Sequence, residues 1–334
     1  MDFNKIKIKI KTTGGKEMKK ILSLLLCFIM TSVMLVGCSG SGDDSNGDKS
    51  KGTIAIITPK AEHGWIAGVT YYAEQKCKEL GVDYKTYQSS NVNEQANDIQ
   101  DAIAAGSSAI VMFPHNEEVS VAAKAIKDAN IPLVVFDRKI DVEYDAYIAG
   151  NNGEMGKASA EYIGKLLDGK GIVAVENTPS AGSVSSERVD GFKSVMSEKY
   201  PDIKLVDFTA DGFAQEQGLA AATDLLTANS KIDAIYSLDD ESSLGFIKAI
   251  EEAGRKDIKT ISGGGGAQSY FNSIKENKDI DLFTATYSPM MMGDAIQLAV
   301  DILDGKKVEK ENIIPTTVIN KDNVADYLDE SSPY

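Results

Sequence analysis

Short apolar runs alternate with longer polar and apolar stretches from residue 53 onward. The runs are rich in β-branched residues, as expected for strands buried on both faces, and lie at 53–58, 109–113, 133–136, 171–176, 234–238, 258–262 and 282–287. The longer stretches place apolar residues at helical spacing, and they predict helices at 65–80, 92–105, 117–129, 154–167, 185–199, 214–228, 240–253 and 289–304.

A strand followed by a helix, many times over, predicts an α/β fold with parallel sheets covered on both faces. About ten such units exceed what one sheet of ordinary size holds, so we expect two Rossmann-like parallel-sheet lobes. In open sheets of this kind, ligands bind beyond the carboxyl ends of the strands. Residues that follow the apolar runs are therefore the candidates for a binding site.

The first 37 residues have the pattern of a targeting signal. Met18 opens "MKKILSLLLCFIMTSVMLVGC", two lysines and an apolar stretch that ends in small residues before Cys38. This pattern is typical of a bacterial lipoprotein signal, so we expect residues 1–37 to be removed, with Met18 as the true start, and Cys38 to carry lipid. Residues 38–52 are rich in Gly, Ser and Asp and predict a flexible tether. A plain secretory signal or a buried helix is the alternative.

Charge and cysteine content exclude several classes of protein. The formal net charge of −15 disfavours nucleic acid and broad binding to anionic membranes. Beyond Cys27 in the signal and Cys38, only Cys77 remains, in a helical pattern where a buried thiol is expected. No disulfide within the chain and no metal site are predicted, and we expect no cofactor.

Catalytic signatures are weak. His63 and His115 each follow an apolar run, with no serine elbow and no cysteine partner nearby. The glycine run in "SGGGGAQ" (262–268) lacks the spacing of a dinucleotide-binding loop and reads as an open turn between strand and helix. We therefore expect a protein that is not an enzyme.

The pair Asp137-Arg138 directly follows the apolar run "LVVF". The chain contains only three arginines, the others being Arg188 and Arg255. A scarce, bulky cation beside an aspartate at a strand end suggests a binding edge.

Five segments in order resemble the sugar-binding proteins of bacterial ABC importers, and specifically the ribose and galactose binders of the type I periplasmic-binding-protein fold. They are "AIITPKAEHGWIAGVTYYAEQKCKELG" (55–81), "IPLVVFDRKI" (131–140), "GNNGEMGKASAEYI" (150–163), "SERVDGF" (186–192) and "IDAIYSLDDESSLGFIKAIEEAG" (232–254). The resemblance runs from about residue 53 to 320. It implies a fold of two lobes, joined by three crossovers, that close on a ligand.

The resemblance implies an N-terminal lobe of 53–152 plus 289–316 and a C-terminal lobe of 153–288 plus 317–334. It implies an extracytoplasmic receptor, anchored through Cys38 to the outer face of the cell membrane, that passes a monosaccharide or polyol to a membrane ABC permease. We expect a monomer that binds no nucleic acid. The alternative is a sugar sensor that signals to a membrane kinase or chemoreceptor.

Polar ligand contacts follow from the same resemblance. In the family, an Asp-Arg pair at this strand end binds sugar hydroxyls. The resemblance therefore implies that Asp137 accepts hydrogen bonds from the ligand and that Arg138 donates them. Arg188 in "SERVDGF" matches a second sugar-contacting arginine from the other lobe. A structural or surface ion pair is the alternative for both arginines.

Aromatic contacts are implied at two places. "HGWI" occupies the position where relatives carry Asn-Pro-Phe-Phe, so His63, Trp65 and Ile66 become candidates. Trp65 is the single tryptophan, and its alternative is a place in the core. Phe213 aligns with an aromatic wall residue of the second lobe.

Departures from the ribose binders bear on the identity of the ligand. Asp239 stands where the ribose binders carry Asn, and Tyr287 stands where they carry Gln. The Asp of the ribose binders falls near Gly264 in this chain. Together with Ile66 and Met290 to Met292, these changes predict a cavity with more apolar lining, suited to a 6-deoxyhexose such as rhamnose or fucose. A pentose or linear polyol is the alternative. Asp239 also fits a helix N-cap, and the methionines fit core packing on a helix face.

Overall fold

The computed structural model describes residues 52–334. The expected signal (1–37), Cys38 and nearly all of the expected tether lie outside the described residues. Among residues 52–334, no helix has both the length and the apolar character that a membrane crossing requires.

The first sheet contains six strands in the order β11-β5-β4-β3-β1-β2. All its neighbouring strands pair in parallel, and their bounds are β1 Thr53–Pro59, β2 Asp83–Ser89, β3 Ala109–Met112, β4 Leu133–Phe136, β5 Ala146–Gly150 and β11 Glu311–Ile314. In the central strands β3, β4 and β5 every residue is buried.

The second sheet contains six strands in the order β12-β10-β9-β8-β6-β7. Its pairs are parallel except for β12, which runs antiparallel to β10. The bounds are β6 Gly171–Asn177, β7 Ile203–Thr209, β8 Ala234–Tyr236, β9 Thr260–Gly265, β10 Asp281–Thr286 and β12 Val318–Ile319. The two sheets thus repeat one doubly wound order, as the alternation of patterns predicts.

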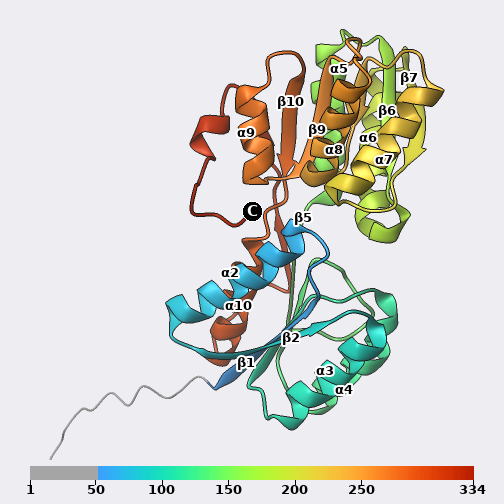
Figure 1. Cartoon of the computed structure of the whole chain (residues 1–334). Helices are drawn as coiled ribbons and strands as arrows, with labels where there is room; N and C mark the ends of the chain where they lie inside the picture. The colour runs from blue at the N-terminus through green and yellow to red at the C-terminus, as the bar shows by residue number, and fades with distance from the viewer. Residues whose placement is uncertain (1–51) are drawn as a thin grey trace, which may run out of the picture. The chain divides into compact units, whose positions relative to one another are not determined.

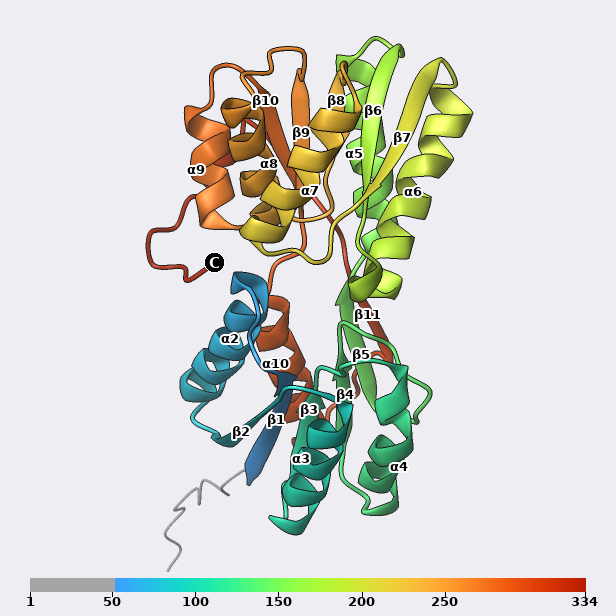
Figure 2. The same cartoon turned by 45° about the vertical axis from the view of Figure 1, so that its right-hand side comes forward.

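Helices connect the strands and cover both sheets (Figures 1 and 2). Their bounds are α2 Gly64–Leu80, α3 Val92–Ala104, α4 Ser120–Asp128, α5 Asn152–Leu166, α6 Ser183–Lys199, α7 Gln215–Ala228, α8 Asp240–Glu252, α9 Gln268–Glu276 and α10 Met291–Leu303, with short 3-10 turns at Glu117–Val119, Pro179–Ala181 and Val324–Asp326. Side-chain oxygens of Asn91, Asn151 and Asp239 cap α3, α5 and α8, which satisfies backbone N–H groups that a helix start leaves unpaired.

Alternate residues of each buried strand face opposite helical layers. In β1, Ile54 and Ile56 pack in the core that contains α2 and α10, whereas Ala55 and Ile57 pack with α3 and α4. The second sheet packs α5 and α6 on one face and α7, α8 and α9 on the other. Cys77 of α2 is fully buried in the first of these layers, as predicted.

Three connections link the two sheets within the described chain. They are Asn151 between β5 and α5, residues 287–290 between β10 and α10, and residues 315–317 between β11 and β12. These connections bring the carboxyl ends of the strands of both sheets toward the same region (Figure 2).

Two expectations about local structure are wrong. The glycine run is no turn, because Gly263, Gly264 and Gly265 belong to strand β9. The methionine run does not line a cavity: Met291 and Met292 are buried in the α2 and α10 core, while Met290 is 59% exposed. The alternative of core packing therefore holds for Met291 and Met292.

Candidate functional site

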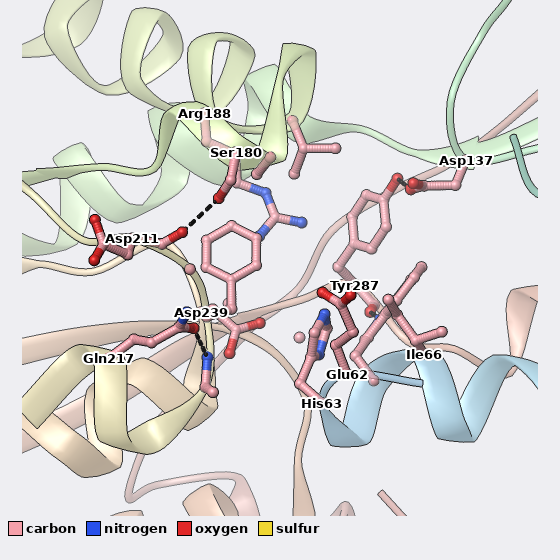
Figure 3. A pocket seen from close by; sticks show the side chains of 18 of the residues that line it. Glu62, His63, Ile66, Asp137, Ser180, Arg188, Asp211, Gln217, Asp239 and Tyr287 are labelled. Carbon is pink, nitrogen blue, oxygen red and sulfur yellow. Dashed lines mark hydrogen bonds between the residues drawn. The ribbon is translucent and has the colours of Figure 1, made fainter. Parts of the chain in front are cut away.

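A cavity of about 280 Å³ lies between the carboxyl ends of the two sheets. All ten residues predicted for a ligand site line it: His63, Trp65, Ile66, Asp137, Arg138, Arg188, Phe213, Asp239, Gly264 and Tyr287. Figure 3 shows the cavity from close by. The structure therefore brings together every residue of the predicted site, from seven separate segments of the chain.

Asp137 is the first residue after β4 and has a positive φ of 64°. This left-handed conformation is uncommon for a residue with a side chain, although Asp tolerates it better than most. The Tyr147 hydroxyl donates to the Asp137 carbonyl at 2.8 Å, which fixes the turn. Its carboxylate accepts from the Tyr287 hydroxyl at 2.5 Å, and burial raises its pKa although Arg138 opposes the shift.

Arg138 lies against the opposite side of the same carboxylate. Its Nε is 3.9 Å from Asp137 Oδ2, its guanidinium stands over the Phe113 ring at 5.2 Å, and it also donates to the His115 carbonyl. Nε is buried and has no hydrogen-bond partner in the described structure. A buried donor without a partner is costly, so the cavity holds a donor that a ligand oxygen would satisfy.

Arg188 approaches from helix α6 of the second sheet. Its Nε donates to Asn152 Oδ1 at 2.8 Å, and one terminal nitrogen donates to the Leu238 carbonyl at 2.6 Å. The guanidinium lies over the Tyr287 ring at 4.8 Å. The side chain is buried and held at three points, so its remaining N–H groups have a fixed direction.

Asp239 caps helix α8, as the sequence alternative proposed, and its Oδ1 accepts from the Glu241 N–H at 2.8 Å. Burial, with Asp240 and Glu241 beside it, raises its pKa well above the usual carboxyl range. It also lines the cavity, so both predicted roles are compatible.

Glu176, near the end of β6, holds the segment 237–239 through hydrogen bonds. This fully buried carboxylate accepts from the Leu238 N–H at 2.7 Å and from the Ser237 hydroxyl at 3.0 Å. Burial raises the pKa of Glu176 to about 7. The Leu238 carbonyl in turn accepts from Arg188. This network therefore positions two cavity residues, Arg188 and Asp239.

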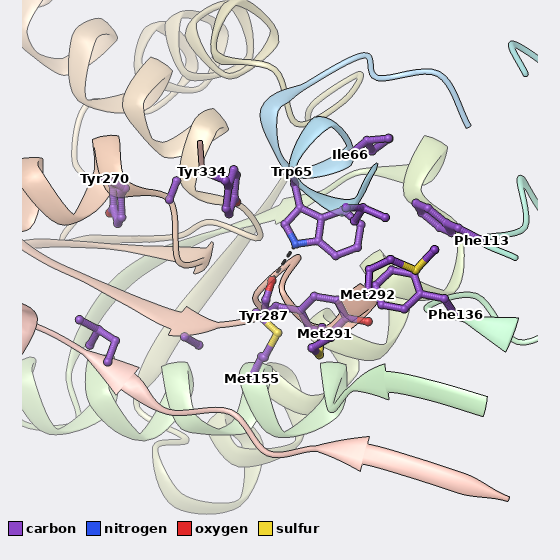
Figure 4. Close-up of a cluster of buried hydrophobic side chains, with 14 of the residues drawn as sticks. Trp65, Ile66, Phe113, Phe136, Met155, Tyr270, Tyr287, Met291, Met292 and Tyr334 are labelled. Carbon is purple, nitrogen blue, oxygen red and sulfur yellow. Dashed lines mark hydrogen bonds between the residues drawn. The ribbon is translucent and has the colours of Figure 1, made fainter. Parts of the chain in front are cut away.

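The aromatic residues divide between core and cavity. Trp65 is 8% exposed, stacks on Phe136 and contacts Phe113 edge to face, and its indole N–H donates to the Tyr287 carbonyl at 2.7 Å. Figure 4 shows it within the buried cluster. Trp65 therefore packs in the core, as its alternative proposed, and also lines the cavity, as predicted.

His63 and Phe213 face each other from the two halves of the site, with ring centroids 6.2 Å apart. Burial and the nearby Arg138 lower the pKa of His63 to about 4. The ring is therefore neutral near pH 7, and its Nδ1 has no hydrogen-bond partner among the described residues.

A direct contact also joins the start of α2 to the start of α8. The Gly64 N–H donates to Glu241 Oε1 at 2.8 Å, close to the cavity residues His63 and Asp239. Here, too, burial raises the pKa of the Glu241 carboxyl above its usual value, although the bond from Gly64 opposes the shift. This bond ties elements of the two sheets together beside the cavity.

Sequence reasoning missed eleven lining residues. These are Glu62, Phe113, Ser180, Ala181, Val184, Asp211, Gly212, Ala214, Glu216, Gln217 and Gly265. Phe113 directly follows β3, and Ser180 and Asp211 come within three residues of the ends of β6 and β7, so the rule that ligands lie beyond carboxyl strand ends would have found them.

The comparisons with known proteins agree with this geometry. Residues 54–307 match the family model described as "Periplasmic binding protein domain". The ribose import binding protein of Bacillus subtilis (strain 168) is 28% identical over 301 residues, which cover 88% of this chain and 96% of that protein. The D-apiose import binding protein of Actinobacillus succinogenes is 30% identical over 63% of this chain and 69% of its own length.

Solved structures share the fold. The arabinose ABC transporter's periplasmic binding protein from Shewanella sp. ANA-3, bound to α- and β-L-arabinofuranose, superposes with a TM-score of 0.76. It is 26% identical and covers 82% of this chain and 94% of its own. The predicted fold of two parallel-sheet lobes is thereby confirmed. The family is one of binding proteins, which agrees with the prediction that the chain is not an enzyme.

Proposed function

The chain belongs to the periplasmic binding protein domain family, and from this premise we propose that it captures a monosaccharide or polyol outside the cytoplasm and delivers it to the permease of an ABC importer. The observation that carries the proposal is the cavity itself. Asp137, Arg138 and Arg188 offer acceptors and forked donors, and Trp65 and Phe213 offer flat apolar surfaces.

This combination fits the chemistry of a sugar. Hydroxyl groups both donate and accept, so they pair with carboxylates and guanidinium groups together. The C–H faces of a sugar ring pack on aromatic rings. A cavity of about 280 Å³ is near the lower end of the volumes usual for small-molecule sites, which suits one monosaccharide.

Capture would involve two lobes, which we propose as 53–152 plus 289–316 and 153–288 plus 317–334. The three connections between the sheets would form the hinge. The Gly64 to Glu241 bond would help to hold the closed form.

Transport is favoured over sensing because relatives bear the names of import binding proteins. We also propose that Cys38 carries the lipid anchor on the outer face of the cell membrane. Cys38→Ser in the full chain would release the protein from the membrane fraction, and retention of this variant would contradict the anchor.

The preference for a 6-deoxyhexose has lost part of its support. Met290, Met291 and Met292 do not line the cavity; Ile66, Gly264 and Tyr287 do. Rhamnose and fucose therefore remain candidates beside pentoses and polyols.

Thermal unfolding of residues 38–334 with pentoses, hexoses, 6-deoxyhexoses and cyclitols tests the proposal. A ligand at 100 times its dissociation constant stabilises the folded state by about 2.7 kcal/mol, which corresponds to about 4 °C in a chain of this size. If no member of the panel shifts the midpoint at millimolar concentration, the proposal is wrong.

A further inference from the structure

Three acidic residues, Asp239, Asp240 and Glu241, lie in a row at the start of α8, and their carboxylates have different surroundings. Asp240 accepts from the Thr284 hydroxyl at 2.6 Å and from the Gly266 and Ala267 N–H groups at 2.6 and 2.7 Å. It is fully satisfied and structural. Glu241 accepts from Gly64. Asp239 alone lines the cavity.

The Asp239 carboxylate keeps one oxygen for the cavity. Oδ1 accepts from the Glu241 N–H, whereas Oδ2 has no hydrogen-bond partner among residues 52–334. The residue as a whole is only 4% exposed, and it lines the cavity. No lysine or arginine in the described chain forms an ion pair with it, unlike Asp137, which has Arg138.

The role of Asp239 as the N-cap of α8 does not explain why this residue is an acid. Asn, Ser and Thr cap a helix about as well as Asp, and they would not place a carboxylate beside Asp240 and Glu241. The nearest cation, Arg188, directs its Nε and one terminal nitrogen to Asn152 and Leu238 and its face to Tyr287. The second-sheet side of the cavity therefore presents a carboxyl group that no cation of the described chain pairs with.

Other acids add to this imbalance. Asp211 and Glu216 line the same side of the cavity, and Glu62 lines the opposite side. His63 is neutral near pH 7 because burial and Arg138 lower its pKa. The cationic groups of the lining are only Arg138 and Arg188, and Asp137 already engages the first.

We propose that the ligand carries a protonated amine that pairs with Asp239, which makes it an amino sugar or aminocyclitol. The inference rests on the proposed function and narrows it. Asp239 accepts the ammonium group through Oδ2, while Asp137, Arg138 and Arg188 hold the hydroxyl groups. Asp239 is then the residue that decides between an amino ligand and its hydroxyl counterpart.

The ionisation of Asp239 gives a second observable sign of amine binding. Burial, Asp240 and Glu241 raise its pKa, and Arg188 opposes the shift. Burial and the Asp239 carboxylate in turn raise the pKa of the Tyr334 hydroxyl. An ammonium ligand favours the ionised carboxylate, so its binding releases a proton. Its affinity rises as the pH climbs above the usual carboxyl range, until the amine itself loses its proton.

Titration calorimetry on residues 38–334 tests this with matched pairs: aminohexoses with the amine at C2, C3 or C6, and an inosamine, each against its hydroxyl counterpart. At least one amine should bind about tenfold tighter or more than its counterpart, the usual gain of a charged over a neutral hydrogen bond. The heat of binding should differ between phosphate and Tris buffers, as proton release requires.

Asp239→Asn is the informative variant, because it keeps the cap and removes the charge. It should abolish the preference for the amine, whereas Asp190→Asn, which removes an exposed charge from α6 outside the cavity, should leave it unchanged. Tighter binding of the hydroxyl sugars overturns the inference but leaves the proposed function intact. Absence of binding by both classes overturns both.

Discussion

The hydroxyl of Tyr287 donates to the carboxylate of Asp137 at 2.5 Å, across 150 positions of sequence. Tyr287 lies on the connection between β10 and α10, and Asp137 directly follows β4 of the first sheet. The bond therefore ties a segment that links the two sheets to the carboxylate that we assign to the ligand. The sequence analysis treated Tyr287 only as the replacement of a glutamine and assigned no role to its hydroxyl.

Tyr287→Phe should weaken ligand binding by about 1.5–3 kcal/mol, the usual contribution of a hydrogen bond to a charged group. The ring would still stack under Arg188, so the loss would come from the freed carboxylate. Calorimetry with the sugar found by thermal unfolding measures it. Unchanged affinity would mean that the bond does not orient Asp137.

The three arginines form a natural set of variants. Arg138→Ala and Arg188→Ala should each weaken binding by roughly 1.5–3 kcal/mol, about ten- to a hundredfold in affinity. Arg255 is the control, since it pairs with Asp257 at 2.7 Å and does not line the cavity. Equal losses of affinity in all three variants would show that the effect is structural.

His63 should make folding stability depend on pH. Its pKa is about 4 in the folded chain against 6.5 for the ordinary value, so the unfolded chain binds more protons between these pH values. The free energy of unfolding should therefore fall as the pH drops from 6.5 to 4, by up to roughly 3 kcal/mol from this residue.

Denaturant unfolding of wild type and His63→Asn at several pH values isolates the contribution of His63. Asn is suitable for the cap position that His63 occupies. The variant should show a flatter dependence on pH over this range. Parallel curves for the two proteins would contradict the burial of a neutral imidazole.

Gly264 is expected to tolerate no side chain. A Cβ there would lie 2.2 Å from the Leu238 carbonyl oxygen, a backbone atom that also holds Arg188. Gly264→Ala should destabilise the fold by 2 kcal/mol or more, as overpacking in a core does, and should weaken binding as well.

Gly293→Ala is the matched control, because its Cβ would meet Lys76 at an ordinary 3.6 Å inside helix α10. Alanine there should be neutral or stabilise by about 0.5–1 kcal/mol. Thermal unfolding compares the two variants. Equal midpoints would refute the close approach at Gly264.

The fold was predictable for most of the strands that are buried on both faces, although the fully buried β5 was missed. The runs at β1, β3 and β4 are continuous and apolar, so their pattern is unambiguous. Strands β2 and β7 lie at sheet edges with mixed burial, and this leaves no continuous apolar run. The glycines of β9 were misread because glycine disfavours strands. The close approach of the Leu238 backbone explains Gly264, and the nearby side chains of Asp240 and Tyr334 explain Gly263 and Gly265.

The site was predictable as a set of residues because strand ends and the resemblance pointed to the same positions. Its chemistry depends on contacts that residue spacing does not reveal. The pairing of Asp137 with Tyr287 and the free oxygen of Asp239 depend on three-dimensional packing. The same is true of the methionines, whose helical spacing fits a cavity wall or a core face equally well.

The central claim is that one small polyhydroxylated ligand binds between the two sheets through Asp137, Arg138 and Arg188. Calorimetric titration of wild type and of the Arg138→Ala/Arg188→Ala double variant, with the ligand that thermal unfolding identifies, tests it most directly. The account predicts one site per chain in the wild type and at least a hundredfold weaker binding in the folded double variant. Wild-type affinity in the double variant would place the ligand elsewhere and contradict the account.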